Sequence, residues 1–166
     1  MAPNASRRRS GTERVPPLFE CLHFQDLTPA QLYAMLQLRS QIFVVEQQCV
    51  FLDLDGLDAD AQHLFGWQDE TRAELLCGVR ILAPGVAYAE PSIGRVVTAR
   101  SARGTGAGRL LMQRAIEACS AMYPGQGIRI GAQRYLERFY ASLQFSTVSE
   151  PYDEDGIPHV TMLREP

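Results

Sequence analysis

Two kinds of hydrophobic pattern alternate along the chain, one typical of β-strands and the other of amphipathic helices. Three segments carry apolar residues on one face at helical spacing: 28–43, 106–122 and 134–143. Six others have the composition or alternation of strands: 18–25, 62–68, 74–83, 92–99, 128–132 and 158–164. The order β-α-β-β-β-α-β-α-β predicts a mixed α/β sheet with one strand, loop and helix unit at its centre.

The first predicted helix has a clear start. Thr28 can cap it, Pro29 suits the first helical position, and Gln31 completes a capping box. Arg39 and Glu46 are seven residues apart, so they share a helix face if the helix reaches that far. We expect them to form a structural ion pair under the sheet.

Length and composition point to one domain. The chain has 166 residues, of which 46% are hydrophobic and 21% charged, enough for a core without disulfides or metals. The polar, proline-containing start predicts a flexible tail over residues 1–16, followed by a single domain over 17–166. A net charge of -3 argues against nucleic acid as a partner. The longest apolar run is too short to span a membrane.

The four cysteines lie far apart and form no CxxC pair. This spacing favours a reduced, cytoplasmic protein with buried thiols, Cys21 among them on the inner face of the first strand. The acidic stretch DLDGLDAD, within residues 47–60, lacks the glycine position and the glutamate of a calcium loop. No metal site is therefore expected.

The most informative stretch runs from Arg95 to Leu111, where a β-branched strand enters a turn and a helix begins. Glycines occupy the alternate positions 104, 106 and 108, and without side chains their backbone N–H groups can approach an anion closely. A helix N-terminus adds unsatisfied donors and a partial positive charge, and arginines flank the turn on both sides. The pattern predicts a phosphate site.

Several phosphate-binding loops compete for this pattern. A Walker loop needs Gly-Lys-Ser/Thr at its end, and a dinucleotide loop needs GxGxxG after the first strand; neither fits. The acyl-CoA pattern Arg/Gln-x-x-Gly-x-Gly/Ala is matched by Arg103, Gly106 and Gly108. The glycines could also serve only to make a tight strand-to-helix turn.

A second element lies on the last predicted helix, where Phe139 and Tyr140 precede Phe145 in the pattern FYxxxQF. Alone, Tyr140 could simply be a core aromatic. Together with the glycine loop, the pattern resembles the GNAT superfamily, whose late helix often reads FYxxxGF. Here Gln144 replaces the glycine, which predicts a different or mildly strained exit from the helix.

Two further segments, LRSQIFVVEQQCVFLDLDGLDADAQHL and YDEDGIPHVTM, resemble the ElaA subgroup of the GNAT proteins. All matching segments together run from Leu18 to Met162. The resemblance implies a GNAT fold: a mixed, mostly antiparallel sheet of six to seven strands flanked by helices, with a central β-loop-α site for the CoA pyrophosphate.

The same resemblance implies an N-acetyltransferase, in which an amine attacks the thioester of acetyl-CoA directly. Tyr140 would then protonate the departing thiolate, and a backbone N–H of the central strand would stabilise the oxyanion. The strand residues are Val96, Val97 and Thr98. The residues implied to hold the pyrophosphate are Arg103, Gly104, Thr105, Gly106, Ala107, Gly108 and Arg109.

The general base and the acceptor stay open at this point. Glu46, His63 and His159 are the candidates for the acceptor side, with Glu90 upstream of the central strand. His63 fits a structural role as well, because it lies in an alternating strand. Exposed strand edges make a homodimer an option. The alternatives to an acetyltransferase are a synthase of the acyl-homoserine-lactone type and a non-catalytic acyl-CoA sensor or scaffold.

Overall fold

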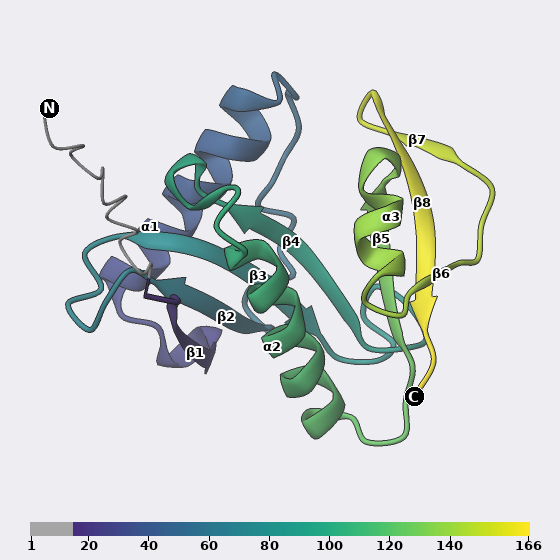
Figure 1. The fold of residues 1–166 in the computed structure, drawn as a ribbon, viewed down its shortest axis with the longest axis horizontal. Helices are drawn as coiled ribbons and strands as arrows, with labels where there is room; N and C mark the ends of the chain where they lie inside the picture. Colours follow the sequence, from purple (N-terminus) through teal and green to yellow (C-terminus); the bar gives the residue numbers. More distant parts are fainter. Residues whose placement is uncertain (1–14) are drawn as a thin grey trace, which may run out of the picture.

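The computed structural model describes residues 15–166 (Figure 1). The strands are β1 (Leu18–His23), β2 (Gln62–Trp67), β3 (Leu75–Leu82), β4 (Ser92–Thr98), β5 (Ile128–Gln133), β6 (Ser146–Thr147), β7 (Tyr152–Glu154) and β8 (Ile157–Arg164). The helices are α1 (Pro29–Arg39), α2 (Ala107–Met122) and α3 (Glu137–Ala141), and a π-helix, η2 (Ser40–Glu46), continues α1. Short 3₁₀ turns are η1 (Phe24–Asp26), η3 (Arg100–Ala102) and η4 (Arg134–Leu136). The tail predicted over residues 1–16 lies outside the described residues, apart from its last two.

The strands form one eight-stranded sheet in the order β1-β2-β3-β4-β5-β8-β6, with β7 paired to β8. Every pair is antiparallel except β4–β5. The predicted mixed, mostly antiparallel sheet flanked by helices is confirmed. The two extra strands, β6 and β7, have only two and three residues, too few for a periodic pattern to reveal them.

The start of α1 follows from its sequence. The Thr28 side chain accepts from the Gln31 N–H at 3.2 Å, and the Gln31 side chain accepts from the Thr28 N–H at 2.9 Å. This capping box satisfies two of the donors that a helix start leaves free. The predicted helix start is confirmed.

Two hydrophobic clusters lie on opposite faces of the sheet. On one face, α2 buries Leu111 and Met112 completely against β3, β4 and β5. On the other face, α1 and η2 pack Met35, Leu38 and Ile42 against strand residues. The site described below lies between these two supports, at the place where the sheet splits.

Strands β4 and β5 pair only at their beginning. Ser92 lies opposite Arg129, and the Arg129 N–H donates to the Pro91 carbonyl at 3.0 Å. Beyond that point the strands diverge, so the sheet separates into the half β1–β4 and the half β5–β8 (Figure 1). The divergence leaves one edge of β4 without a neighbouring strand, and its backbone groups on that edge can meet a ligand.

The cysteine expectations are met in part. Within residues 15–166 all four cysteines are free. Cys49, Cys77 and Cys119 are buried. Cys21 shares the sheet face of Phe19 and of its partner Leu64, as predicted, but it is exposed on the edge strand β1. No helix among the described residues is long and apolar enough to cross a membrane. The same residues contain no group of three metal-ligating side chains.

Candidate active site

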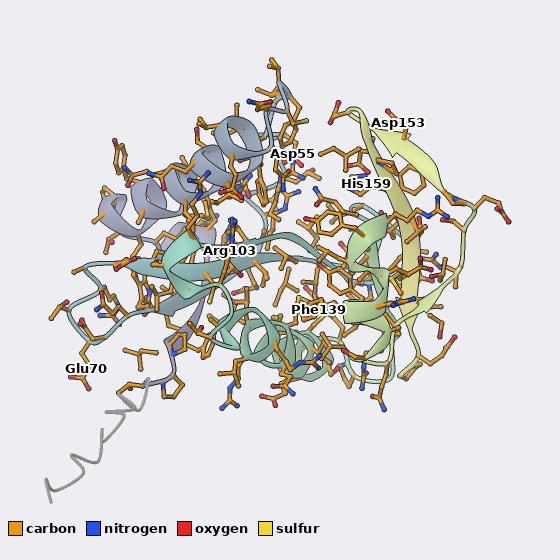
Figure 2. All side chains as sticks on the ribbon, turned by 45° about the horizontal axis from the view of Figure 1, so that its top comes forward. Asp55, Glu70, Arg103, Phe139, Asp153 and His159 are labelled. Carbon is orange, nitrogen blue, oxygen red and sulfur yellow. The ribbon has the colours of Figure 1, made fainter. Side chains whose placement is uncertain are left out.

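A cavity of about 670 Å³ opens where β4 and β5 diverge. It is lined from one side by η2, the loop after it, and β4, and from the other side by β5, α3 and the turn between β7 and β8. Figure 2 shows Asp55 and Arg103 on the first side, and Phe139 and His159 on the second. The cavity is large enough for part of a drug-sized ligand.

Strand β4 carries a bulge at Arg95. Its backbone has φ 50°, in the left-handed region. The register with β3 shifts here, since Val97 pairs with Gly78 but Gly94 pairs with Arg80. As a result Ile93 faces the α2 side and Val97 the α1 side, although an even spacing would place them on one face.

The residues of β4 after the bulge are among those that border the cavity. Val96, Val97 and Thr98 all line it. Because β5 has already diverged, this edge of β4 offers backbone groups that no strand uses. The Val96 and Thr98 N–H groups are directed to this open edge, where an oxyanion could be stabilised, whereas the N–H of Val97, opposite Gly78, is directed to β3.

The glycine loop lies at the mouth of the same cleft. Gly104 and Gly106 have φ 72° and 90°, conformations that suit glycine, and Gly106 is the N-cap of α2. Within residues 15–166, the backbone N–H groups of Gly104, Thr105, Gly106 and Gly108 donate to no protein acceptor. Gly104 and Gly106 are exposed. The loop is thus an accessible set of free amides at a helix N-terminus, which favours an anion.

Gly108 is needed for a different reason. A Cβ there would lie 3.3 Å from the Thr98 hydroxyl, so the residue lets α2 begin close to the end of β4. Ala107 is buried and anchors the first turn of α2 in the core. The cavity itself reaches the loop at Arg103 and Gly108. Gly104 and Gly106 are exposed beyond the cavity lining, so their amides are accessible to a diphosphate at the cavity mouth.

The two arginines of the loop are held in different ways. Arg103 pairs with Glu46 at 2.7 Å, and Arg100 pairs with the same carboxylate. Arg109 donates to the Ser142 hydroxyl at 2.8 Å and lies over the Phe139 ring. Hydrogen bonds from Arg103 and Arg100 lower the pKa of Glu46. Glu46 lines the cavity, but this double pairing makes it a weak proton acceptor.

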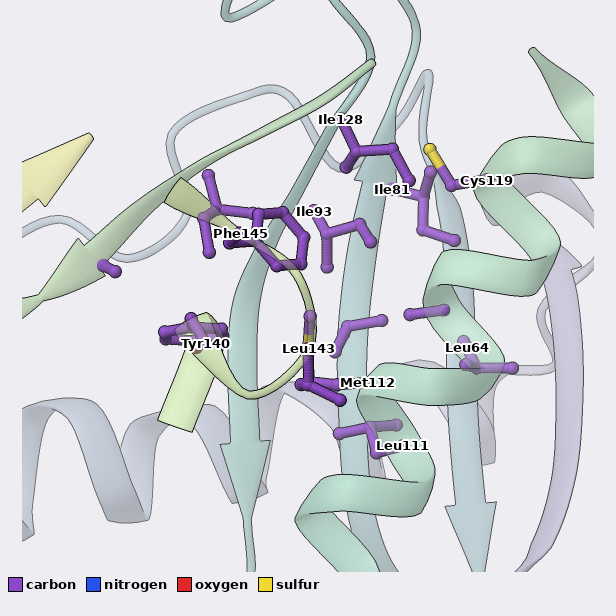
Figure 3. Close-up of a cluster of buried hydrophobic side chains, with 14 of the residues drawn as sticks. Leu64, Ile81, Ile93, Leu111, Met112, Cys119, Ile128, Tyr140, Leu143 and Phe145 are labelled. Carbon is purple, nitrogen blue, oxygen red and sulfur yellow. The ribbon is translucent and has the colours of Figure 1, made fainter. Parts of the chain in front are cut away.

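Tyr140 lines the cavity from α3 and is 4% exposed. Its ring packs edge-on against Phe139 and Phe145, and Figure 3 shows it at the margin of the α2-side cluster. Burial raises the pKa of Tyr140 to about 12. The hydroxyl therefore remains protonated near neutral pH and can donate a proton or a hydrogen bond.

His159 also lines the cavity, from β8. Its Nδ1 lies 2.8 Å from the Ile157 carbonyl oxygen, which can only accept, so Nδ1 carries a proton, and the neutral form of the ring has its lone pair on Nε2. The ring stacks on Tyr152 of β7. Among residues 15–166 His159 forms no ion pair, and it is the one histidine in the cavity lining.

The other two candidate bases lie elsewhere. His63 is 1% exposed in β2, outside the large cavity, with Nε2 3.1 Å from the Asp58 carbonyl. Burial lowers its pKa, so it is a neutral core histidine. Glu90 is also outside the lining and forms a two-bonded pair with Arg129, which lowers the pKa of Glu90 to about 2. The structure therefore does not bring His63 and Glu90 to the acceptor side.

The acidic loop forms a charge network that the sequence did not predict. Arg39 pairs with Asp53 at 2.8 Å and with Asp58 at 2.7 Å, and not with Glu46. The expected Arg39–Glu46 pair is wrong, because η2 adds an extra residue per turn and turns Glu46 toward the glycine loop. Three arginines and three aspartates take part: Arg39, Arg80, Arg95, Asp53, Asp55 and Asp58.

Gln144 has φ 70°, so the residue that replaces the usual glycine adopts the conformation that glycine would adopt. Its side chain accepts from Arg164 Nη2 at 3.0 Å. The mildly strained exit predicted from the sequence is therefore observed, and the chain still returns Phe145 to the core, where it is 2% exposed.

Comparisons with known proteins agree with this geometry. Residues 78–165 match the family described as acetyltransferase (GNAT) domain. The protein ElaA of Escherichia coli K12 is 42% identical over 146 residues, 87% of this chain and 94% of that protein. The crystal structure of an acyl-CoA N-acyltransferase from Pseudomonas aeruginosa has a TM-score of 0.83 at 41% identity and covers 89% of this chain and 99% of that one. The structure of Escherichia coli ElaA also has a TM-score of 0.83, at 40% identity, with coverage of 90% and 99%.

Proposed function

Because the chain belongs to the GNAT family of acyltransferases and has ElaA among its relatives, we propose that it transfers an acetyl group from acetyl-CoA to an amine. One observation carries the proposal: the unpaired amides of Gly104, Thr105, Gly106 and Gly108 lie at the mouth of a cavity beside the free edge of β4. A diphosphate at the amides would direct the pantetheine chain along that edge. Beyond acyl transfer in general, we propose that the acyl group is acetyl and that the acceptor is an amine.

The residues present fit such a donor. The loop amides and the cations of Arg103 and Arg109 would hold the phosphates, and acetyl-CoA would supply the activated acyl group. A backbone N–H of Val96 or Thr98 would donate to the thioester oxygen as negative charge develops there. Tyr140, kept protonated by burial, would donate to the thiolate as it departs.

His159 is the side chain that we assign as general base. An alkyl amine has a pKa near ~10, so it must lose a proton before it attacks. Of the candidates, Glu46 is held by two arginines, while His63 and Glu90 lie outside the cavity. His159 alone combines a place in the lining with a free lone pair on Nε2. It would take the proton directly or through one water.

The experiment has two stages. Calorimetry measures the binding of acetyl-CoA and CoA, and thiol release is then followed with a panel of small amines and peptide amines. We expect saturable binding with one site per chain and release that depends on the amine. A chain that binds neither acetyl-CoA nor CoA would contradict the proposal.

Tyr140→Phe tests the acid role within this scheme. The variant keeps the ring and its packing but loses the donor, so turnover should fall about 10- to 100-fold while affinity for CoA changes less than about twofold. Tyr135→Phe is the matched control, because Tyr135 is exposed and also borders the cavity. An unchanged turnover in Tyr140→Phe would exclude the role.

A non-catalytic acyl-CoA sensor is the second candidate. It is favoured by the pairing of Glu46 and Glu90 with arginines, which leaves His159 as the one sequence-predicted base that lines the cavity without an ion pair among the described residues. Tight binding of acetyl-CoA without amine-dependent thiol release, across the whole panel, would support the sensor.

A cytoplasmic location is also part of what we propose for this protein: it agrees with three buried, free cysteines that a reducing compartment preserves. A homodimer through an open sheet edge stays a prediction.

A further inference from the structure

The network of arginines and aspartates meets the active site at the β4 bulge. Its arginines come from three elements, α1, β3 and β4, and its aspartates come from one loop, residues 53–58. Asp55, Arg80 and Arg95 also line the cavity. The acidic loop is therefore part of the wall that faces the free edge of β4.

Arg95 is the member at which the backbone and the network meet. Its own residue has the left-handed φ of the bulge, a conformation that costs a side-chain-bearing residue free energy. Its guanidinium lies 2.8 Å from Asp53 Oδ1 and donates at 3.0 Å to both the Asp53 carbonyl and Asp55 Oδ2. The Phe51 ring lies under the same group. The side chain of the strained residue is thus fixed at several points.

The partners of Arg95 are fixed in turn. Arg80, opposite Gly94 at the other side of the bulge, holds both oxygens of Asp55 at 2.6 and 2.7 Å. Arg39, 1% exposed, holds Asp53 from α1. The bulge is therefore tied to the helix on one side and to the neighbouring strand on the other.

Stability alone does not account for this arrangement. Removing charges from water costs free energy, and apolar side chains of similar volume often replace buried ion pairs without loss. The hydrogen bonds of the network are directional, so they fix the position of the backbone more narrowly than apolar contacts would. The network sets the position of the residue directly before Val96, which lines the cavity and whose N–H lies on the edge of β4 away from β3.

We propose that Asp53 and Asp55 are positioning residues for acyl transfer: by holding Arg95, they fix the β4 bulge and so place the backbone N–H group of Val96 against the donor thioester. The inference rests on the proposed acyl transfer and deepens it. Neither aspartate touches the reacting atoms in this scheme; each acts through Arg95.

The first readout is spectroscopic and needs no acceptor. Acetyl-CoA labelled with ¹³C at its carbonyl is bound to the protein, and the infrared band of the thioester carbonyl is compared with that of the free compound. A donor on β4 moves the band to lower frequency in the unaltered protein. In Asp55→Asn, whose side chain is 28% exposed, at least half of that displacement should be lost. Asp55→Glu keeps the charge and should recover part of it.

The second readout is kinetic. A displacement of reacting groups by about 1 Å can cost on the order of 100-fold in rate. We expect Asp55→Asn and Asp53→Asn to lower kcat at least about tenfold, with the KM for acetyl-CoA within about twofold, because the phosphate loop is unaltered. Glu117→Gln is the matched control: it removes the carboxylate of an exposed pair with Arg114 on α2 and should change neither readout.

The outcomes separate the two proposals. If Asp55→Asn is folded and binds acetyl-CoA but keeps the full carbonyl displacement and kcat, the positioning role is overturned and the acyl transfer stands. If the unaltered protein does not bind acetyl-CoA, both proposals fall. Should Asp53→Asn not fold, Asp55→Asn decides the question alone, since it carries both readouts.

Discussion

The two walls of the cavity are built on different principles. The N-terminal wall, formed by the lining residues within 42–57 and 80–98, has its charged groups in ion pairs, several of them buried. The C-terminal wall, formed by the lining residues within 131–159, carries Glu154, Asp155 and His159, which form no ion pair among residues 15–166. Figure 2 shows Asp55 of the first wall across from His159 of the second. In the proposed acyl transfer, the first wall would fix the geometry, and the second would leave groups free for proton transfer and for the acceptor.

The largest expected effect is on the stability of the N-terminal wall. Arg39→Leu leaves Asp53 and Asp58 without their shared partner, and breaking a buried pair in this way costs about 3–5 kcal/mol. The free energy of unfolding, measured in urea, should fall by that amount. Arg114→Leu, at an exposed pair on α2, is the control and should cost less than about 1 kcal/mol. Equal losses of unfolding free energy in the two variants would mean that the buried network stabilises the protein no more than an exposed ion pair does.

The next largest effect is a loss of catalytic rate, caused by a change in the C-terminal wall. His159→Gln removes the free lone pair of the imidazole, and loss of a general base lowers kcat/KM by about 100-fold or more. Since the residue is half-buried and forms no ion pair, the melting temperature should change little. His23→Gln, at the far end of β1 and outside the cavity, is the matched control. A rate within about twofold of the unaltered protein would remove His159 from the mechanism.

The two sites of these variants, the charge network and His159, show which features could not be predicted from the sequence. The glycine loop, the strand before it and Tyr140 were predicted, because turn chemistry and helix capping are local. The network was not, because Arg39, Asp53 and Arg80 are joined only by the fold. One signal for the network was available in the sequence: three arginines lie in a predicted helix and predicted strands, and three aspartates lie in the acidic stretch within residues 47–60. The choice of His159 over His63 likewise needed the cavity, since both are histidines within strands.

Acid provides a smaller test of the N-terminal wall. The hydrogen bonds from Arg80 hold the pKa of Asp55 below its ordinary value of 3.8. Burial works to raise the pKa of Asp58, but Arg39 and Arg80 outweigh it, so this pKa is lowered too. Groups with lowered folded-state pKa values contribute stability that is complete above the unfolded value and is lost as the pH falls toward the folded one.

The free energy of unfolding should therefore decline as the pH falls from about 4 to about 2, and the decline should be shallower in Asp55→Asn. Urea unfolding at a series of pH values measures it. Asp60→Asn, at an exposed aspartate without an ion pair among the described residues, serves as the comparison and should keep the slope of the unaltered protein. An identical slope in Asp55→Asn would show that this carboxylate does not stabilise the wall.

The smallest expected effect lies behind the C-terminal wall, at the exit from α3. Gln144 has φ 70°, and glycine adopts that conformation without the clash that a Cβ brings. Gln144→Gly loses the exposed hydrogen bond to Arg164 and gains chain entropy when unfolded, so the net gain in stability should be only about 0.5 kcal/mol. Gln113→Gly, in the exposed middle of α2, should change stability in the opposite direction by about 1 kcal/mol. Because Tyr140 is anchored by Phe139 and Phe145 rather than by residue 144, turnover should stay the same, and a loss of turnover in Gln144→Gly would mean that the strained exit helps to place the tyrosine.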